Sequence, residues 1–207
     1  MSPLSRRAFA TAAAAVLLAG CGGSPSHRSA GRDPGSVPPP SPVSVKSARP
    51  LARSVPVRLR IPALGVDTPL MQLGLAADGT VQVPPITAHD RAGWYRNSPT
   101  PGQLGPSVIL GHVTVGAYGD GVFRRLGGLR PGDRIETRLE NGTTAVFAVD
   151  AVRTVRKADF PADEVYGNTD RPELRLITCG GPRTGDGYLD NVIVFAALST
   201  AETSPRS

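Results

Sequence analysis

The sequence is poor in the residues that build disulfide frameworks and metal centres. Its 207 residues include only two cysteines and three histidines, and aromatic residues make up 5% of the chain. Two cysteines cannot supply the several cross-links of a disulfide-stabilised secreted fold, and so few thiols and imidazoles do not make a tetrahedral metal site. We therefore predict no metal and no other cofactor.

Long amphipathic helical patterns are also scarce, whereas the chain holds 21 prolines and 24 glycines. Short apolar runs instead alternate with polar residues, as expected for strands with one buried face. These runs are Val57–Ile61, Val66–Leu70, Val81–Val83, Arg134–Leu139 and Thr143–Val152. Asn141-Gly142 is typical of a hairpin turn, and single helical turns are expected at Phe123–Leu126 and within 159–168. This pattern predicts a mainly β fold, a closed or nearly closed β-barrel.

The basic residues are concentrated at one end of the chain. The formal net charge is +6, but seven of the 23 lysines and arginines lie in residues 1–53 with only one of the 17 acids. Sixteen residues of each sign remain beyond residue 53, so the domain that follows is about neutral. This balance argues against nucleic-acid binding by the fold and places the basic charge in the leader and the segment after it.

The N-terminus has the pattern of an export signal. Arg6 and Arg7 precede an apolar run, Ala10–Leu18, that is too short for a stable membrane-spanning helix. We predict a signal peptide of the twin-arginine type over residues 1–21. The residues before Cys21 resemble a bacterial lipoprotein box, which implies cleavage before Cys21 and a lipid anchor on the outer face of the cell membrane. The alternative is an uncleaved anchor or a simple secretory signal with an incidental cysteine.

Residues 22–53 are rich in serine, proline and glycine and contain almost nothing to bury. Such a segment is expected to be an extended, disordered tether. Its basic residues could rest on anionic lipid or wall polymer, each contributing about 1 kcal/mol, or the segment is only a soluble spacer. These residues are Arg28, Arg32, Lys46, Arg49 and Arg53. We expect a single domain over 54–200 and a short tail over 201–207.

One thiol remains inside this domain. An apolar, alternating run beginning at Leu174 leads to Cys179, and Gly180-Gly181 follow it. A thiolate is a strong nucleophile, but a free cysteine titrates near pH 8.5 and needs a base or cation beside it. Cys179 is either buried and inert or retained for reactivity. The small neighbours favour reactivity because they leave no bulky side chain over the sulfur on that side.

Only one histidine is well placed to assist that thiol. His27 lies in the tether and His89 in a polar loop, whereas His112 directly follows the short apolar run Val108–Leu110, which predicts a buried strand. His112 is either a hydrogen-bonded core residue or the acid–base partner of Cys179. The thiol downstream favours the second interpretation.

Three segments together resemble the sortases, membrane-associated cysteine transpeptidases of Gram-positive bacteria. The segments are Val108-Ile109-Leu110-Gly111-His112, Leu176-Ile177-Thr178-Cys179 and the strand entered through Asp190-Asn191. The Cys-Gly-Gly and Tyr-x-Asp-Asn-Val runs are most similar to the actinobacterial class F branch. The resemblance covers about Val57–Leu198.

This resemblance implies an eight-stranded β-barrel with Cys179 at the end of the penultimate strand and His112 across a groove. It also implies recognition of a Leu-Pro-x-Thr-Gly-like sorting signal on partner proteins and cleavage between threonine and glycine. A cell-wall precursor amine would then accept the acyl group, with water as a slower substitute.

The sequence departs from the family at the third catalytic group. Sortases generally place on the last strand an arginine that steadies the oxyanion. Here Asn191 takes that position, and no arginine lies between Tyr188 and Ala196. An asparagine amide can donate to an oxyanion, and loss of one such donor typically costs about 2.7–4 kcal/mol. Arg183, in the loop after Cys179, could swing in instead, and we rank Asn191 ahead of it.

A smaller departure is Arg175, where many sortases carry threonine; we expect this change to affect packing more than chemistry. Two other functions stay open. An L,D-transpeptidase also pairs cysteine with histidine, but its Ser-His-Gly-Cys run is absent from this sequence. A lipid-anchored module that holds a peptide without cutting it is the non-enzymatic alternative.

Overall fold

The computed structural model describes residues 48–185 and 187–203. The predicted signal peptide, Cys21 and most of the tether, up to residue 47, lie outside the described residues. Within those residues no helix has the length and apolar character needed to cross a membrane.

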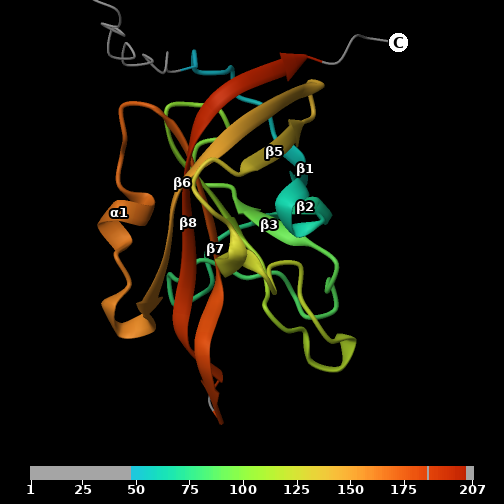
Figure 1. Cartoon of the computed structure of the whole chain (residues 1–207), viewed down its shortest axis with the longest axis vertical. Helices are drawn as coiled ribbons and strands as arrows, with labels where there is room; N and C mark the ends of the chain where they lie inside the picture. Colours follow the sequence, from blue (N-terminus) through green and yellow to red (C-terminus); the bar gives the residue numbers. More distant parts are fainter. Residues whose placement is uncertain (1–47, 186, 204–207) are drawn as a thin grey trace, which may run out of the picture. The chain divides into compact units, whose positions relative to one another are not determined.

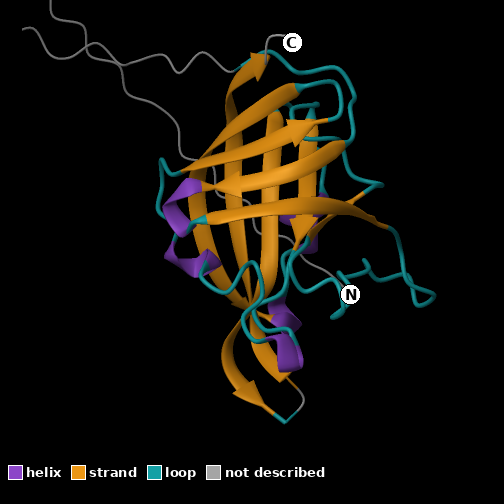
Figure 2. Cartoon of the chain, turned by 90° about the vertical axis from the view of Figure 1, so that its right-hand side faces the viewer, coloured by secondary structure: helices purple, strands orange, loops and turns teal. Residues whose placement is uncertain are grey.

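Eight strands close into a barrel in the order β1-β2-β3-β4-β7-β8-β6-β5, which confirms the fold predicted from the sequence (Figures 1 and 2). The strands are β1 (Pro56–Ile61), β2 (Val66–Leu73), β3 (Ala92–Tyr95), β4 (Gly105–Leu110), β5 (Arg134–Leu139), β6 (Thr143–Arg156), β7 (Pro172–Thr184) and β8 (Gly187–Thr203). The long β7–β8 hairpin projects beyond the barrel at the bottom of Figure 2. Gly142 has a φ of 82° in the turn between β5 and β6, as expected for the Asn-Gly hairpin.

The described helices are short. They are η1 (Pro62–Leu64), η2 (Gly116–Tyr118), η3 (Leu126–Gly128), η4 (Lys157–Asp159) and α1 (Ala162–Tyr166). The helical turn expected at 123–126 occurs three residues later as η3, and the one expected within 159–168 is α1. Because none of these helices reaches two full turns, the hydrophobic core is built almost entirely by strands.

Two local predictions were wrong. Residues 81–83 do not form a strand, and only Val81 makes a single bridge, with Leu75. Conversely, the turn-rich approach expected around Gly93 contains strand β3, which pairs with β2 and β4. Gly93 belongs in this strand because an added Cβ would lie 2.3 Å from Leu73 Cδ1. The side chain of Leu73 on β2 therefore occupies the space that a side chain at position 93 would need.

Most neighbouring strands are antiparallel, but β4 runs parallel to β7. In a parallel pair both strands end at the same edge of the sheet. Leu110, the last residue of β4, is paired with Ile177. The residues that follow each of them therefore lie side by side, although 65 or more positions separate them in the sequence.

The apolar side chains form two clusters on opposite faces of the barrel wall. The barrel interior contains the larger cluster, which includes Trp94, Ile109, Phe147 and Leu176. The second cluster lies on the outer face of β4, β7 and β8. Its buried members are Leu73, Val108, Leu110, Val165, Ile177 and Ile193. Every residue of β4 is buried because both of its faces are covered.

Two connections cover this outer face. The β6–β7 connection, residues 157–171, contributes Val165 from α1, with Phe160 packed against the same cluster. Figure 1 shows α1 outside the barrel. The β2–β3 connection, residues 74–91, contributes Val81. The outer face is therefore a shallow second core between the barrel wall and two loops.

The structured unit extends beyond the expected boundaries of 54 and 200. Leu51 packs against the interior cluster, and its backbone N–H donates to Gly102 O at 2.8 Å. At the other end, β8 continues to Thr203, and Thr143 pairs with Thr203. The last residues assigned to the tether and the first residues of the tail are thus part of the barrel.

Candidate active site

Parallel pairing of β4 with β7 brings the two sequence-predicted site residues to neighbouring positions. The pairing continues past the end of β4, where Gly111 N–H donates to Ile177 O at 3.1 Å and Thr178 Oγ1 donates to Gly111 O at 2.8 Å. His112 is the next residue after Gly111, and Cys179 is the next after Thr178. The structure therefore brings them together although they are 67 residues apart.

Both side chains are expected on the outer face of the barrel. Side chains alternate between the two faces of a strand. Leu110 and Ile177 belong to the outer cluster, whereas Leu176 belongs to the interior one. His112 and Cys179 each follow an outer-face residue by two positions. The thiol consequently lies on the outer face, and the backbone of His112, which follows the end of β4, lies beside that of Cys179.

Cys179 is half-buried and is the free thiol of the described chain. It does not end its strand as expected, because β7 continues to Thr184. The paired glycines leave room for β8 to pack closely against β7. A Cβ on Gly180 would lie 2.7 Å from Val192 Cγ2, and Gly181 has a φ of 70° with Asp190 Oδ2 only 2.0 Å from where its Cβ would be. They permit a bulge in the β7–β8 ladder.

The two candidates for the third group occupy different places. Asn191 lies directly across from Cys179 in the β7–β8 ladder, so their side chains share a face, and its Nδ2 donates to Thr178 O at 3.3 Å. Arg183 lies beyond the bulge, pairs with Tyr188, and has its guanidinium carbon 5.9 Å from the centre of that ring. Asn191 is the nearer of the two along the ladder.

His112 is held from two sides by backbone groups. Its Nε2 is 2.6 Å from the carbonyl oxygen of Pro84, in the β2–β3 connection. Its own carbonyl accepts from Phe123 N–H at 3.0 Å, and Gly121 lies so close that a Cβ there would be 2.3 Å from this carbonyl oxygen. Sequence reasoning missed Pro84 because a backbone carbonyl leaves no signal in the side-chain pattern.

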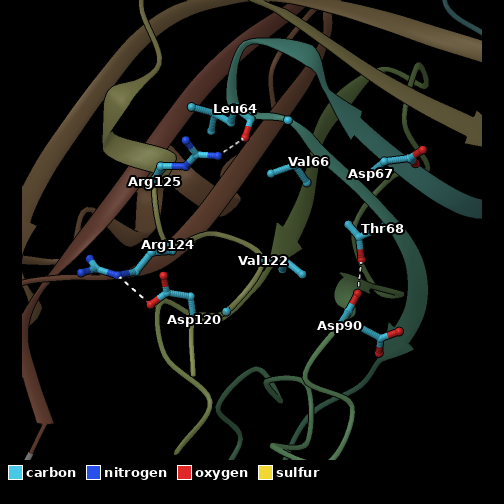
Figure 3. A pocket seen from close by; sticks show the side chains of 11 residues that line it. Leu64, Val66, Asp67, Thr68, Asp90, Asp120, Val122, Arg124 and Arg125 are labelled. Atoms are coloured by element: carbon cyan, nitrogen blue, oxygen red, sulfur yellow. Dashed lines mark hydrogen bonds and ion pairs between the residues drawn. The ribbon is translucent and has the colours of Figure 1, made fainter. Parts of the chain in front are cut away.

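One cavity lies at the thiol strand, and another lies between β2 and the segment 120–125. The smaller, of about 200 Å³, is lined by Thr178, Cys179, Gly180 and Arg124 among others. Thr178 and Gly180 alternate with Cys179, so this cavity lies chiefly behind the thiol. A larger cavity of about 390 Å³ is drawn in Figure 3. Arg124 lines both cavities and is paired with Asp120, at 3.1 Å between Nε and Oδ1.

A buried ion pair anchors the β6–β7 connection. The side chains of Arg175 and Glu173 are only 6% and 8% exposed, and they pair with each other on β7. Arg175 Nε also donates to the backbone carbonyl of Glu164 in α1 at 3.3 Å, and the guanidinium lies 4.7 Å from the centre of the Phe195 ring. Arg175 therefore serves packing, as expected from its position in the sequence.

An exposed ion pair reinforces the same connection. Arg153 on β6 pairs with Glu164, and its hydrogen bond holds the pKa of the Glu164 carboxyl below the ordinary value. Arg153 also stacks over Phe195, 4.2 Å from the ring centre. Two arginines thus lie against Phe195, and both reach α1.

Both the sequence and the fold are similar to those of known proteins. Residues 59–199 match the family model of the sortase domain. The structure is similar to sortase C-1 from Actinomyces oris, with a TM-score of 0.55 and 20% identity over 72% of this chain and 74% of that one. It is also similar to Listeria monocytogenes sortase A, with a TM-score of 0.55 and 17% identity over 74% of this chain and 93% of that one. No curated protein sequence matches this chain significantly.

Proposed function

The chain belongs to the sortase family, and on that premise we propose that it is an extracytoplasmic cysteine transpeptidase acting on Leu-Pro-x-Thr-Gly-like sorting signals. The observation that supports the proposal is the parallel pairing of β4 with β7, which continues to Gly111 and Thr178 and sets the backbones of His112 and Cys179 side by side. The Cys-Gly-Gly and Tyr-x-Asp-Asn-Val runs favour the class F branch.

The first step is formation of a thioester. The Cys179 thiolate attacks the threonine carbonyl of the sorting signal, and a bond forms between sulfur and that carbon. As the threonine–glycine amide bond breaks, protonated His112 gives a proton to the departing glycine amine. The first product leaves with a free N-terminus, and the acyl group remains on the enzyme.

The second step transfers this acyl group to an amine of a cell-wall precursor. The amine attacks the thioester carbonyl, His112 takes a proton from its nitrogen, and the carbon–sulfur bond breaks to restore the thiolate. The net reaction exchanges one amide for another. Water in place of the amine would give slower hydrolysis.

In both steps the negative charge develops on the carbonyl oxygen of the substrate threonine, which requires hydrogen-bond donors beside Cys179. We assign the Gly180 N–H and the side-chain amide of Asn191 to this role, since Asn191 lies across from Cys179 on the same face. Arg183 is the alternative because its segment lies just beyond the bulge. Asn191 would act as a dipole without a full positive charge.

Exposed apolar side chains suit the sorting signal, which begins with leucine and proline. Val83 and Ile86 of the β2–β3 connection are 57% and 45% exposed, and Tyr166 of α1 and Leu189 of β8 are also exposed. We propose that these exposed apolar residues contribute to the surface that binds the sorting peptide.

We also propose that export and lipidation of Cys21 hold the domain on the outer face of the membrane. The N-terminal arginine pair and the lipoprotein-like box support this localisation. It would place the domain beside cell-wall precursors and anchored substrate proteins. A mature N-terminus elsewhere than Cys21 would contradict it.

The proposal is tested with a fluorescent Leu-Pro-x-Thr-Gly peptide and an added amine. We expect the wild-type chain to cleave between threonine and glycine and to form the amide. Cys179→Ala should abolish both reactions because no nucleophile remains, and His112→Ala should leave only a trace. Wild-type cleavage by Cys179→Ala would contradict the assignment.

The same assay ranks the candidates for the third group. Asn191→Ala should lower kcat by roughly 100-fold, the typical loss of one oxyanion donor, and Arg183→Ala should have little effect. The reverse pattern would assign the role to Arg183.

A further inference from the structure

The imidazole of His112 makes a hydrogen bond with a backbone carbonyl that belongs to none of the proposed catalytic residues. Nε2 lies 2.6 Å from the carbonyl oxygen of Pro84, within hydrogen-bond range. A carbonyl oxygen accepts hydrogen bonds and cannot donate them, so the proton of this bond belongs to Nε2. In the neutral ring the second nitrogen, Nδ1, then carries the lone pair.

The acceptor is well suited to this role. Pro84 is followed by Pro85, so the carbonyl belongs to an amide that has no N–H and both residues have a restricted φ. Ala88 N–H donates to Pro85 O at 2.9 Å and closes a turn directly after the pair. The chain is thus stiffened on both sides of the Pro84 carbonyl.

A second contact joins the same two segments. His89, five residues after Pro84, stacks on Tyr118 of η2 with ring centres 4.4 Å apart and planes inclined by 2°. Tyr118 lies six residues after His112. The β2–β3 connection is therefore attached to the segment after β4 at two points, of which one is the candidate acid–base residue itself.

We propose that the Pro84 carbonyl is the positioning group of His112, which holds the ring in its Nε2–H form and leaves Nδ1 to exchange protons with the departing and incoming amines. This inference rests on the proposed transpeptidase function. In catalytic triads a third group orients the base and stabilises its charged form. Here the carbonyl oxygen of Pro84 has this orienting role, and it accepts the hydrogen bond from Nε2 throughout both steps.

The tautomer itself can be measured without any substrate. In the full chain labelled with ¹⁵N-histidine, two-bond ¹H–¹⁵N spectra at a pH where the rings are neutral distinguish the two tautomers. Loss of one signal in His112→Gln assigns its resonances against those of His27 and His89. We expect His112 to be predominantly in the Nε2–H form, whereas a predominant Nδ1–H form would overturn the proposal.

The effect on catalysis is tested by weakening this one carbonyl. Replacing Pro85 by lactic acid turns the Pro84 carbonyl into an ester carbonyl, a weaker acceptor, and removes no N–H because proline has none. Replacing Pro84 by lactic acid is the matched control: it changes the Val83 carbonyl instead and also removes one proline ring.

We expect the variant with lactic acid at position 85 to lower kcat about 10-fold with little change in KM. The same variant should raise the fraction of His112 in the Nδ1–H form. The control with lactic acid at position 84 should stay close to wild type. An equal fall in kcat in both variants, or a rise in KM with kcat unchanged, would show that the loop matters only for its shape. Either result would overturn the proposal. If the wild-type chain cleaves no sorting peptide, the proposed function fails, yet the tautomer measurement still decides the positioning of His112.

Discussion

Two connections pack against the outer face of the same barrel, and different forces hold them. The β6–β7 connection is tied to the wall by Arg175, whose guanidinium is buried with Glu173 and also reaches a carbonyl of α1. The β2–β3 connection is tied through the hydrogen bond from His112 and the stack of His89 on Tyr118. One connection is attached by residues that take no part in the chemistry, and the other by the proposed acid–base residue.

Because the two connections are attached differently, we expect changes in them to affect different properties of the protein. A buried charge pair costs much to break because removal of one partner leaves the other charge uncompensated. A single neutral hydrogen bond typically contributes only about 0.5–1.5 kcal/mol to stability, yet it can fix the geometry on which a proton transfer depends. Changes in the first region should therefore be seen in unfolding, and changes in the second in turnover.

The largest expected effect on stability comes from Glu173→Ala. It leaves the Arg175 guanidinium buried without its carboxylate, and we expect a loss of about 3–5 kcal/mol in the free energy of unfolding. Chemical denaturation of the chain measures this loss. The kcat per folded molecule should change little, because neither residue lies at the thiol.

The matched control replaces the pair as a whole. Glu173→Leu combined with Arg175→Met fills the site with apolar side chains, and such replacements are often neutral or stabilising. We expect the double variant to recover most of the loss. A double variant as unstable as Glu173→Ala would show that the connection depends on the charges themselves.

A smaller effect on stability, with a larger one on turnover, is expected for Gly121→Ala. The added Cβ would lie 2.3 Å from the carbonyl oxygen of His112 and would force that residue to move. We expect a loss of about 1–3 kcal/mol in stability and, since small displacements of catalytic groups are costly, about a 10- to 100-fold fall in kcat.

Gly185→Ala is the control for this substitution, because nothing lies within 4 Å of the position of its Cβ. It should match the wild type in both stability and kcat. Normal turnover in Gly121→Ala would contradict the view that the segment behind His112 fixes its position.

The sequence could predict the barrel because strands with one solvent-exposed face show clear alternation, as Val57–Ile61 and Arg134–Leu139 do. It could not predict strand β3, which is only four residues long and contains Gly93. Val81–Val83 alternates equally well but has no strand partner beyond the Val81 bridge. Pairing between strands, rather than local pattern, decided these two cases.

The candidate site was predictable as far as its side chains. Cys179 and His112 each follow an apolar run, and the parallel pairing of β4 with β7 sets their backbones side by side. Gly180 and Gly181 also make room for β8, and this role becomes visible only when the neighbouring strand is in place. The contact with Pro84 was not predictable, because every residue carries a carbonyl.

The proposed transpeptidation requires an acyl-enzyme at Cys179. The chain is incubated with a Leu-Pro-x-Thr-Gly peptide without an acceptor amine, quenched in acid, and examined by intact mass and peptide mapping. We predict an added mass equal to the peptide through threonine, attached to Cys179 and removed by an added amine. The absence of any adduct during peptide cleavage, or an adduct that persists in Cys179→Ala, would contradict the account.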